Sequence, residues 1–432
     1  MLVVFIYVLF SAAFSAVTYL PTEADSLHYH IPLAEGFLQG NFGGGGYGNT
    51  IHMYFPAATE TLLAVQMALG IPVGFFNVFG VLALVGSCFL LGQAYDLKKE
   101  AAITFAVTVG TLYGVVRWVH AQTVDIWLAA YYVAVVALLK RPSTNWSYFL
   151  NLGIFLGLLI GSKYSGPLFA IGLILVFGAH FWKFLRESKL NGKTNSNLRL
   201  QTSSDTYFKS AEILFSSNWI KVGAAGACTV GIGGFWYLRN WWVTGNPFFP
   251  LDTPFFAGVS GNAIIEVPIW KAYLLYPRQM LDGAVSEFMF WPVMILGMIV
   301  YLIYSWCCHK TKIPITGAVP VVFRMPEWPA IRALLSLALY NFAVFLLLPS
   351  GDSMQLHVSQ YRFAYVVVIP LLLILFILSK KITAVAILMP WAVLSNFLVL
   401  TQFPYRPKLA TAVILIPLSI IFLTKQHTAS KK

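Results

Sequence analysis

The sequence predicts an all-α polytopic membrane protein of about twelve transmembrane helices. Of its 432 residues, 58% are hydrophobic and only 10% are charged, a composition outside the range of soluble globular domains. Apolar runs close to the length that crosses a bilayer recur along the whole chain. We place these spans near residues 1–20, 74–95, 101–118, 123–140, 147–161, 165–182, 219–236, 286–306, 331–348, 362–378, 382–400 and 410–424.

Lysine and arginine set the orientation of the spans, because short loops rich in these residues stay in the cytoplasm. With the N-terminus inside, most of the 28 lysines and arginines fall on the inner side and most of the 16 acids on the outer side. Topology therefore accounts for the net charge of +12, and no nucleic-acid partner is indicated. We predict an integral protein of the inner or plasma membrane, with both termini in the cytoplasm.

The first outer loop, residues 21–73, is too long to be a simple turn. Two stretches of it, 31–38 and 56–69, are apolar enough to form helices lying in the membrane interface. Asp25 follows the first span directly and precedes His28 and His30. An unpaired charge at this depth is costly, so the carboxylate is expected to serve chemistry. The alternative is that Asp25 caps a helix beginning at Ser26.

Other ionisable residues fall on the same outer side. Asp125 lies between the third and fourth spans, and Lys163 and Arg362 lie at outer ends of spans. Arg239 stands among aromatic residues in the segment 235–250, at the level where lipid headgroups begin. A guanidinium there can bind a lipid phosphate with two hydrogen bonds. A plain headgroup anchor is the alternative for Arg239, and snorkelling is the alternative for Lys163 and Arg362.

Acids and cations on one membrane face suit a reaction on a lipid-linked phosphate. Transfer of a sugar from a polyprenyl phosphate fits well, since the leaving phosphate needs cations more than it needs an acid catalyst. One carboxylate can then deprotonate the acceptor hydroxyl. We predict Asp25 as that base. We predict that Tyr29, His28, His30, Glu60 and Asp125 support the base or position the substrates. We predict that Lys163, Arg239 and Arg362 bind the donor phosphate.

Four short motifs resemble those of the GT-C-fold membrane glycosyltransferases. They are Asp25 with Tyr29-His30-x-Pro32, Thr-Val-Asp ending at Asp125, Gly-x-Lys-Tyr around Lys163, and Arg-Asn-x-x-x-x-Gly-Asn-Pro over 239–247. The order of these motifs is similar to that in polyprenyl-phosphate-sugar enzymes related to protein O-mannosyltransferases and lipid A aminoarabinose transferase. The resemblance implies a GT-C fold with interfacial helices in the first outer loop, an acid acting there as base, and transfer with inversion to a lipid, glycan or protein acceptor.

The resemblance covers residues 1–250, which we predict to be the catalytic transmembrane module. Residues 251–432 form a second transmembrane module, and residues 183–217 a mobile cytoplasmic linker. Some of these enzymes bind a divalent cation through such acids, and His28 and His30 could contribute. A His-x-His pair alone is weak evidence for metal, so no metal ligand is assigned. Alternative functions are an O-antigen polymerase or ligase and a transporter or flippase of lipid-linked sugars.

Overall fold

The structure, a computed structural model, describes residues 2–42, 51–191, 219–259, 267–311, 325, 327–350 and 360–396. Within these ranges the chain is helical apart from turns and one short antiparallel pair of strands, β1 (Val267–Pro268) and β2 (Pro349–Ser350). The all-α prediction is therefore confirmed for the described residues. The predicted span 410–424 and most of the predicted linker lie outside them, and residues 183–191 of that linker belong to helix α9.

The N-terminal part forms helices up to the first long gap. In order they are α1 (Leu2–Thr18), η1 (Ser26–His30), α2 (Ile31–Leu38), η2 (Ile51–Tyr54), α3 (Ala58–Ala68), η3 (Val73–Phe75), α4 (Phe76–Ala94), α5 (Lys99–Gly110), α6 (Tyr113–Trp118), α7 (Asp125–Lys140), α8 (Trp146–Ser162) and α9 (Ser165–Asn191). The two interfacial stretches predicted in the first outer loop correspond to α2 and α3.

The remaining helices complete the bundle. They are α11 (Trp219–Thr229), η4 (Val230–Gly234), α12 (Phe235–Thr244), α13 (Ile269–Leu275), α14 (Pro277–Phe288), α15 (Trp291–Thr311), α16 (Trp328–Leu347), η6 (Gln360–Ala364), α18 (Tyr365–Ser379) and α19 (Thr383–Ser395). Two segments, η1 and η4, are π-helical, a geometry often found at functional sites.

Three described helical stretches are long and apolar enough to cross a membrane: Val73–Ala94, Trp328–Leu347 and Gln360–Ser379. A fourth span results if α14 and α15, which meet at an angle of 105°, are counted together. The protein is thus an integral membrane protein. The figure of about twelve spans stays a prediction, partly because the predicted span 101–118 breaks into α5 and α6 after Gly110.

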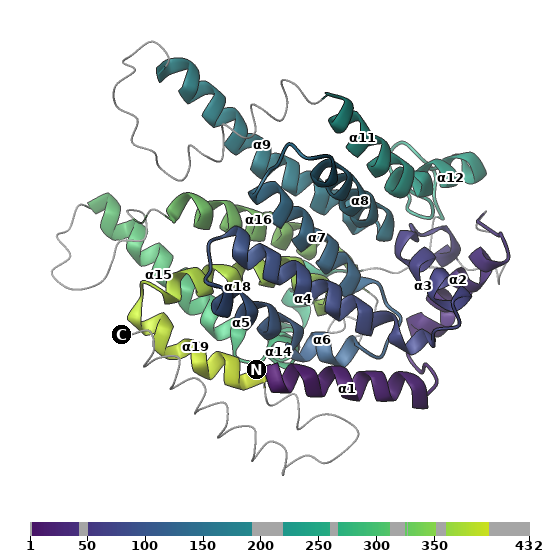
Figure 1. Cartoon of the computed structure of the whole chain (residues 1–432), viewed down its shortest axis with the longest axis horizontal. Helices are drawn as coiled ribbons and strands as arrows, with labels where there is room; N and C mark the ends of the chain where they lie inside the picture. The colour runs from purple at the N-terminus through teal and green to yellow at the C-terminus, as the bar shows by residue number, and fades with distance from the viewer. Residues whose placement is uncertain are drawn as a thin grey trace.

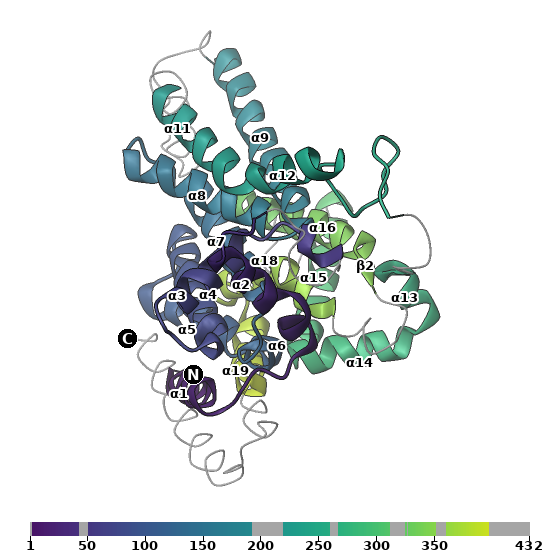
Figure 2. The same cartoon turned by 90° about the vertical axis from the view of Figure 1, so that its right-hand side faces the viewer.

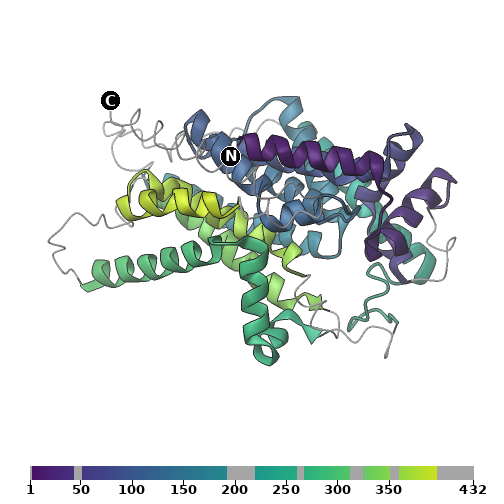
Figure 3. The same cartoon turned by 90° about the horizontal axis from the view of Figure 1, so that it is seen from below.

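Helices α4, α5, α7, α8, α16 and α18 run roughly side by side and form the body of the molecule (Figure 1). Helices α2 and α3 cover one end of this body, as the view from that end confirms (Figure 2). The C-terminal end of α9 lies at the opposite end (Figure 1). From below, α1 crosses the body lengthwise and α14 stands nearly perpendicular to α15 (Figure 3).

Helix α18 lies at the centre of the bundle. Its residues are apolar on every side, and all of them except Ser379 are buried. A helix without a polar face must be enclosed by other helices or by lipid. Here α16, α7, α5, α15 and α19 pack around it, and η6, which directly precedes α18, packs against α14, α16, α6 and α7.

Glycines allow α8 to pack directly on the segment formed by α11 and η4. A Cβ atom added at Gly233 would lie 2.6 Å from the carbonyl oxygen of Gly157, closer than real side chains come. Small residues of this kind let two helix backbones approach each other within a membrane protein. Helix α12 continues directly from η4, so this contact also determines where α12 lies.

Candidate active site

Glu23 shapes the start of the first outer loop. Its Oε1 accepts a hydrogen bond from the Asp25 amide at 3.0 Å, and its Oε2 accepts from the Ser26 amide and hydroxyl, both at 2.7 Å. The Asp25 side chain makes no capping hydrogen bond. The alternative in which Asp25 caps this helix is therefore wrong, because Glu23 already satisfies the free amides and leaves the Asp25 carboxylate available.

Four of the predicted residues form one chain of ion pairs, which we call the charge cluster: Asp25, Arg362, Asp125 and Lys163. Arg362 donates from Nη2 to Asp25 Oδ2 at 2.7 Å, and its Nε lies 3.3 Å from Asp125 Oδ2. Lys163 donates from Nζ to Asp125 Oδ1 at 2.9 Å. The cluster joins the start of the first outer loop, the N-terminus of α7, the C-terminal end of α8 and η6, so both predicted modules contribute to it.

Aromatic rings support both cations of the cluster. The Arg362 guanidinium carbon lies 5.0 Å from the centre of the Trp118 ring, and Lys163 Nζ lies 3.6 Å from the centre of the Phe363 ring. Cations in such positions gain a favourable interaction with the negative ring face, and the gain increases as water is excluded. Sequence reasoning missed Trp118 and Phe363, although each directly follows an arginine in the sequence.

Exposure differs sharply between the two acids of the cluster. The Asp125 side chain is 2% exposed and the Asp25 side chain 34%. Burial alone would raise the pKa of Asp25, but the Arg362 guanidinium, with smaller contributions from His30 and Lys163, holds it below its usual value. Asp25 is therefore ionised at neutral pH and accessible from outside the protein.

A buried pair lies beside the cluster. His30 Nδ1 lies 2.8 Å from Glu60 Oε1, and both side chains are 3% exposed. A carboxylate on one ring nitrogen fixes the orientation of an imidazole and leaves the other nitrogen for a second partner. The pair brings together η1 and α3, two helices that the sequence places 30 positions apart.

The other aromatic and imidazole candidates have different surroundings. The Tyr29 ring stacks on His52, with ring centres 4.8 Å apart, and burial lowers the pKa of His52. His28 is exposed, and its Nδ1 lies 2.8 Å from the carbonyl oxygen of Ala24 in the preceding turn. Tyr29 and His30 thus belong to the interior of the first outer loop, whereas His28 lies on its surface.

Arg239 occupies a separate position on α12. Its Nε and Nη2 donate to Asn240 Oδ1 at 3.1 and 2.7 Å, and Nη2 also contacts the carbonyl oxygen of Phe55 at 3.4 Å. The guanidinium carbon lies 5.0 Å from the centre of the Trp236 ring. Arg239 Nη1 is buried and has no hydrogen-bond partner within the described residues. The other two guanidinium nitrogens, Nε and Nη2, are already bonded within the protein, so Nη1 is the nitrogen left for a further partner.

The two asparagines of the Arg-Asn-x-x-x-x-Gly-Asn-Pro motif build the loop after α12. Asn240 Nδ2 donates to the carbonyl oxygen of Tyr54 at 2.8 Å, and Asn246 Nδ2 donates to those of Leu251 and Ala257. Gly245 ends the helix with a φ of +75°, a conformation that favours glycine. The motif therefore shapes the outer loops around Arg239.

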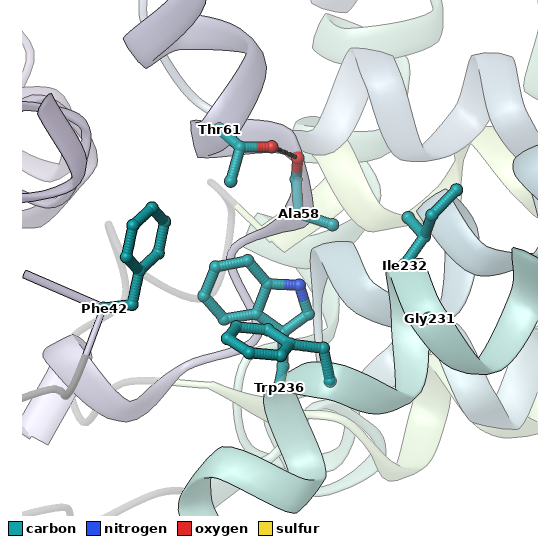
Figure 4. Close-up of a pocket in the computed structure, with 7 residues that line it drawn as sticks. Phe42, Ala58, Thr61, Gly231, Ile232 and Trp236 are labelled. Atoms are coloured by element: carbon teal, nitrogen blue, oxygen red, sulfur yellow. Dashed lines mark hydrogen bonds between the residues drawn. The ribbon is translucent and has the colours of Figure 1, made fainter. Parts of the chain in front are cut away.

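An apolar cavity of about 470 Å³ lies between the first outer loop and the η4–α12 segment (Figure 4). It is lined by Phe42, Ala58, Thr61, Gly231, Ile232, Phe235 and Trp236. Trp236 lies between this cavity lining and Arg239, since its ring also contacts the guanidinium. The aromatic belt was predictable from the sequence, but this cavity was not, because its walls come from separate segments of the chain.

The acids of the charge cluster do not fit a divalent cation in this arrangement. Both oxygens of Asp125 and one oxygen of Asp25 already face the cations of Lys163 and Arg362. No group of three or more His, Cys, Asp or Glu side chains suited to a metal occurs among the described residues.

No protein-family model and no curated protein matches the sequence. Solved structures do match. ArnT from Cupriavidus metallidurans bound to undecaprenyl phosphate aligns with 99% of this chain and 71% of its own, with a TM-score of 0.52 and 13% identity. Apo ArnT aligns with 98% of this chain and 70% of its own, with a TM-score of 0.51 and 13% identity.

The apo oligosaccharyltransferase of Archaeoglobus fulgidus aligns with 97% of this chain, with a TM-score of 0.44 and 17% identity. This chain spans only 55% of the length of that enzyme. The similarity to ArnT extends over nearly the whole chain, and it gives the protein the GT-C fold predicted from the short motifs. At this identity the similarity establishes the fold alone.

Proposed function

We propose that this protein is an integral membrane glycosyltransferase that moves a sugar from a polyprenyl-phosphate-linked donor to an acceptor hydroxyl on the extracytoplasmic side. The observation that carries the proposal is the charge cluster, which joins an accessible carboxylate to two cations at the end of the bundle covered by α2 and α3. The GT-C fold supports it, since ArnT shares that fold and was solved with undecaprenyl phosphate bound.

In the proposed reaction Asp25 acts as the general base. Its carboxylate takes the proton of the acceptor hydroxyl while that oxygen attacks the anomeric carbon of the donor sugar. The bond from the anomeric carbon to the phosphate oxygen breaks, and polyprenyl phosphate leaves with the electron pair. A single displacement of this kind inverts the anomeric configuration. Asp25 suits this role because its side chain is partly exposed and its carboxylate is ionised at neutral pH.

Lys163 and Arg362 are proposed to stabilise the leaving phosphate, which gains charge as the glycosidic bond breaks. Asp125 holds both cations from its buried position and prevents either from turning away. An incoming phosphate therefore competes with the more exposed Asp25 for Arg362, and the competition releases the base when the donor binds. Arg239, with its unpartnered Nη1, is proposed as a further contact for the donor phosphate.

The remaining candidates are proposed to position the substrates. The His30–Glu60 pair fixes the face of η1 that lies next to Asp25, and Tyr29 packs beside His30 with ring centres 4.0 Å apart. His28, on the surface of the same helix, is placed to meet the acceptor as it enters. The acceptor is a lipid, glycan or protein hydroxyl.

The proposal is tested with purified protein in proteoliposomes and a panel of radiolabelled polyprenyl-phosphate sugars. Candidate lipid, glycan and protein acceptors are supplied, and label that leaves the donor is followed. The expected result is transfer of one sugar by the wild-type protein and none by Asp25→Asn. Transport of intact donor across the bilayer without cleavage would overturn the transferase proposal in favour of a flippase.

A further inference from the structure

Glu287, at the end of α14, is a buried carboxylate that the reaction above does not use. Its side chain is 3% exposed, and Oε2 lies 3.6 Å from Arg117 Nη1. Its Oε1 accepts a hydrogen bond from the Tyr365 hydroxyl at 3.3 Å. Removing a carboxylate from water at this depth costs several kcal/mol, which a single long ion pair repays poorly. The position of Glu287 therefore calls for a role beyond packing.

The carboxylate lies directly against the backbone of α6. A Cβ atom added at Gly114 would be 2.2 Å from Glu287 Oε1 and 2.6 Å from its carboxyl carbon. A side chain at position 114 would therefore require the Glu287 carboxylate to move from its present position. Glu287 is thus enclosed by α6 on one side and by the first turn of α18 on the other.

Both of these elements also hold Arg362. The guanidinium carbons of Arg117 and Arg362 each lie 5.0 Å from the centre of the same Trp118 ring. Tyr365 follows Arg362 by three positions, at the point where η6 becomes α18. Glu287 therefore contacts Arg117, the residue before Trp118, and Tyr365, the first residue of the helix that continues from η6, where Arg362 lies.

We propose that Glu287 is a positioning residue for Arg362, acting through Arg117 and Trp118 on one side and through Tyr365 on the other. Only the expected change in the donor KM rests on the proposed function; the positioning of Arg362 by Glu287 does not. Glu287 lies at the end of α14, just before the bend into α15, and its carboxylate faces a further cation, Arg117. Loss of its charge lets the Trp118 ring shift, and the Arg362 guanidinium moves away from Asp25 and from the donor phosphate.

The first test is a double-mutant cycle in thermal stability. It compares Glu287→Gln, Arg362→Lys and the double variant with the wild-type protein in detergent. If Glu287 positions the guanidinium, the two substitutions disturb the same contacts. The fall in melting temperature of the double variant should then be smaller than the sum of the falls in the two single variants. Additive shifts would overturn the proposal. The matched control is Glu327→Gln, whose carboxylate also lies 3.6 Å from a cation, Lys381, and whose shift should add to that of Arg362→Lys.

The second test is kinetic and distinguishes positioning from mere stabilisation. Glu287→Gln should raise the donor KM about tenfold and leave the acceptor KM unchanged, while Glu287→Asp, which keeps the charge, should recover part of the loss. Tyr365→Phe removes one hydrogen bond and keeps the fold, so it should shift the donor KM in the same direction. Unchanged donor KM in both folded variants would refute the proposal. If the wild-type protein transfers no sugar at all, the proposed function fails, and the stability cycle still decides the role of Glu287.

Discussion

Asp25 and Asp125 bind the same guanidinium, and their asparagine variants should nevertheless fail in different ways. Asp125 is 2% exposed and faces Lys163 at 2.9 Å and Arg362 at 3.3 Å. Removing one charge from a buried ion pair costs about 3–5 kcal/mol. Lys163 is 24% exposed and Arg362 keeps Asp25 as a partner, so the lower end, about 3 kcal/mol, is expected for Asp125→Asn.

The Asp25 side chain is 34% exposed, and its pairing with Arg362 is partly screened by solvent. An exposed ion pair contributes about 1 kcal/mol or less, and the amide of Asp25→Asn can still accept a hydrogen bond from Arg362. We therefore expect a change in melting temperature of about 1 °C or less for Asp25→Asn and a fall of roughly 3 °C for Asp125→Asn. Transfer should fall by at least about a hundredfold in Asp25→Asn, because the amide cannot take the proton of the acceptor.

Thermal unfolding in detergent, followed by size-exclusion chromatography, gives the stability of each variant. Transfer from labelled donor at 25 °C or below, on the fraction that stays folded, gives the activity. Near-normal turnover by folded Asp25→Asn protein would refute the base assignment. A larger loss of stability in Asp25→Asn than in Asp125→Asn would refute the division between an accessible catalytic acid and a buried structural one.

Three further predictions concern binding, pH and topology. Arg239→Ala should raise the donor KM more than the acceptor KM, with partial recovery in Arg239→Lys, and equal changes in both KM values would argue for a purely structural role. Because Arg362 lowers the pKa of Asp25 from 3.8, the stability from this pair is complete above pH 3.8 and is lost as pH falls through the lowered pKa. Arg362→Gln should therefore move the acid limb of kcat/KM to higher pH, and an unmoved limb would show that Asp25 is not the titrating base. In a cysteine-free background, Phe255→Cys should react with an impermeant thiol reagent from outside and Lys99→Cys should not, and the reverse would invert the topology.

The sequence predicted the fold through features that are local along the chain. Apolar runs identified three stretches that the structure shows as membrane-length helices, and the interfacial stretch 31–38 has the bounds of α2. Breaks within apolar runs were not predictable in this way. The run 101–118 divides after Gly110, and the run 219–236 passes through the π-helical segment η4, because tertiary packing decides such breaks.

For the site, the side of the membrane on which the charged residues lie was predictable from the sequence. The ion pairs that they form were not. The alternation of spans placed Asp25, Asp125, Lys163 and Arg362 on one face of the membrane, and the structure brings all four together. The bond between Asp25 and Arg362 joins residues 337 positions apart, and its formation depends on how α7, α8 and α18 pack. The role of Glu23 depends on residues next to it in the sequence. A carboxylate two or three residues before free helix amides is a local capping signal.

Glu287 illustrates the limit of hydropathy as a guide to function. It falls at the start of the predicted span 286–306, and an acid at a membrane boundary is common enough that the sequence does not mark it as functional. The structure ends a helix there and turns the chain by 105° into α15, so the carboxylate points into the protein beside Arg117 instead of into water. An acidic residue in an apolar segment indicates a functional role when its side chain is buried inside the protein. Finding its partners requires the fold, because Arg117 and Tyr365 lie in helices far from Glu287 along the sequence.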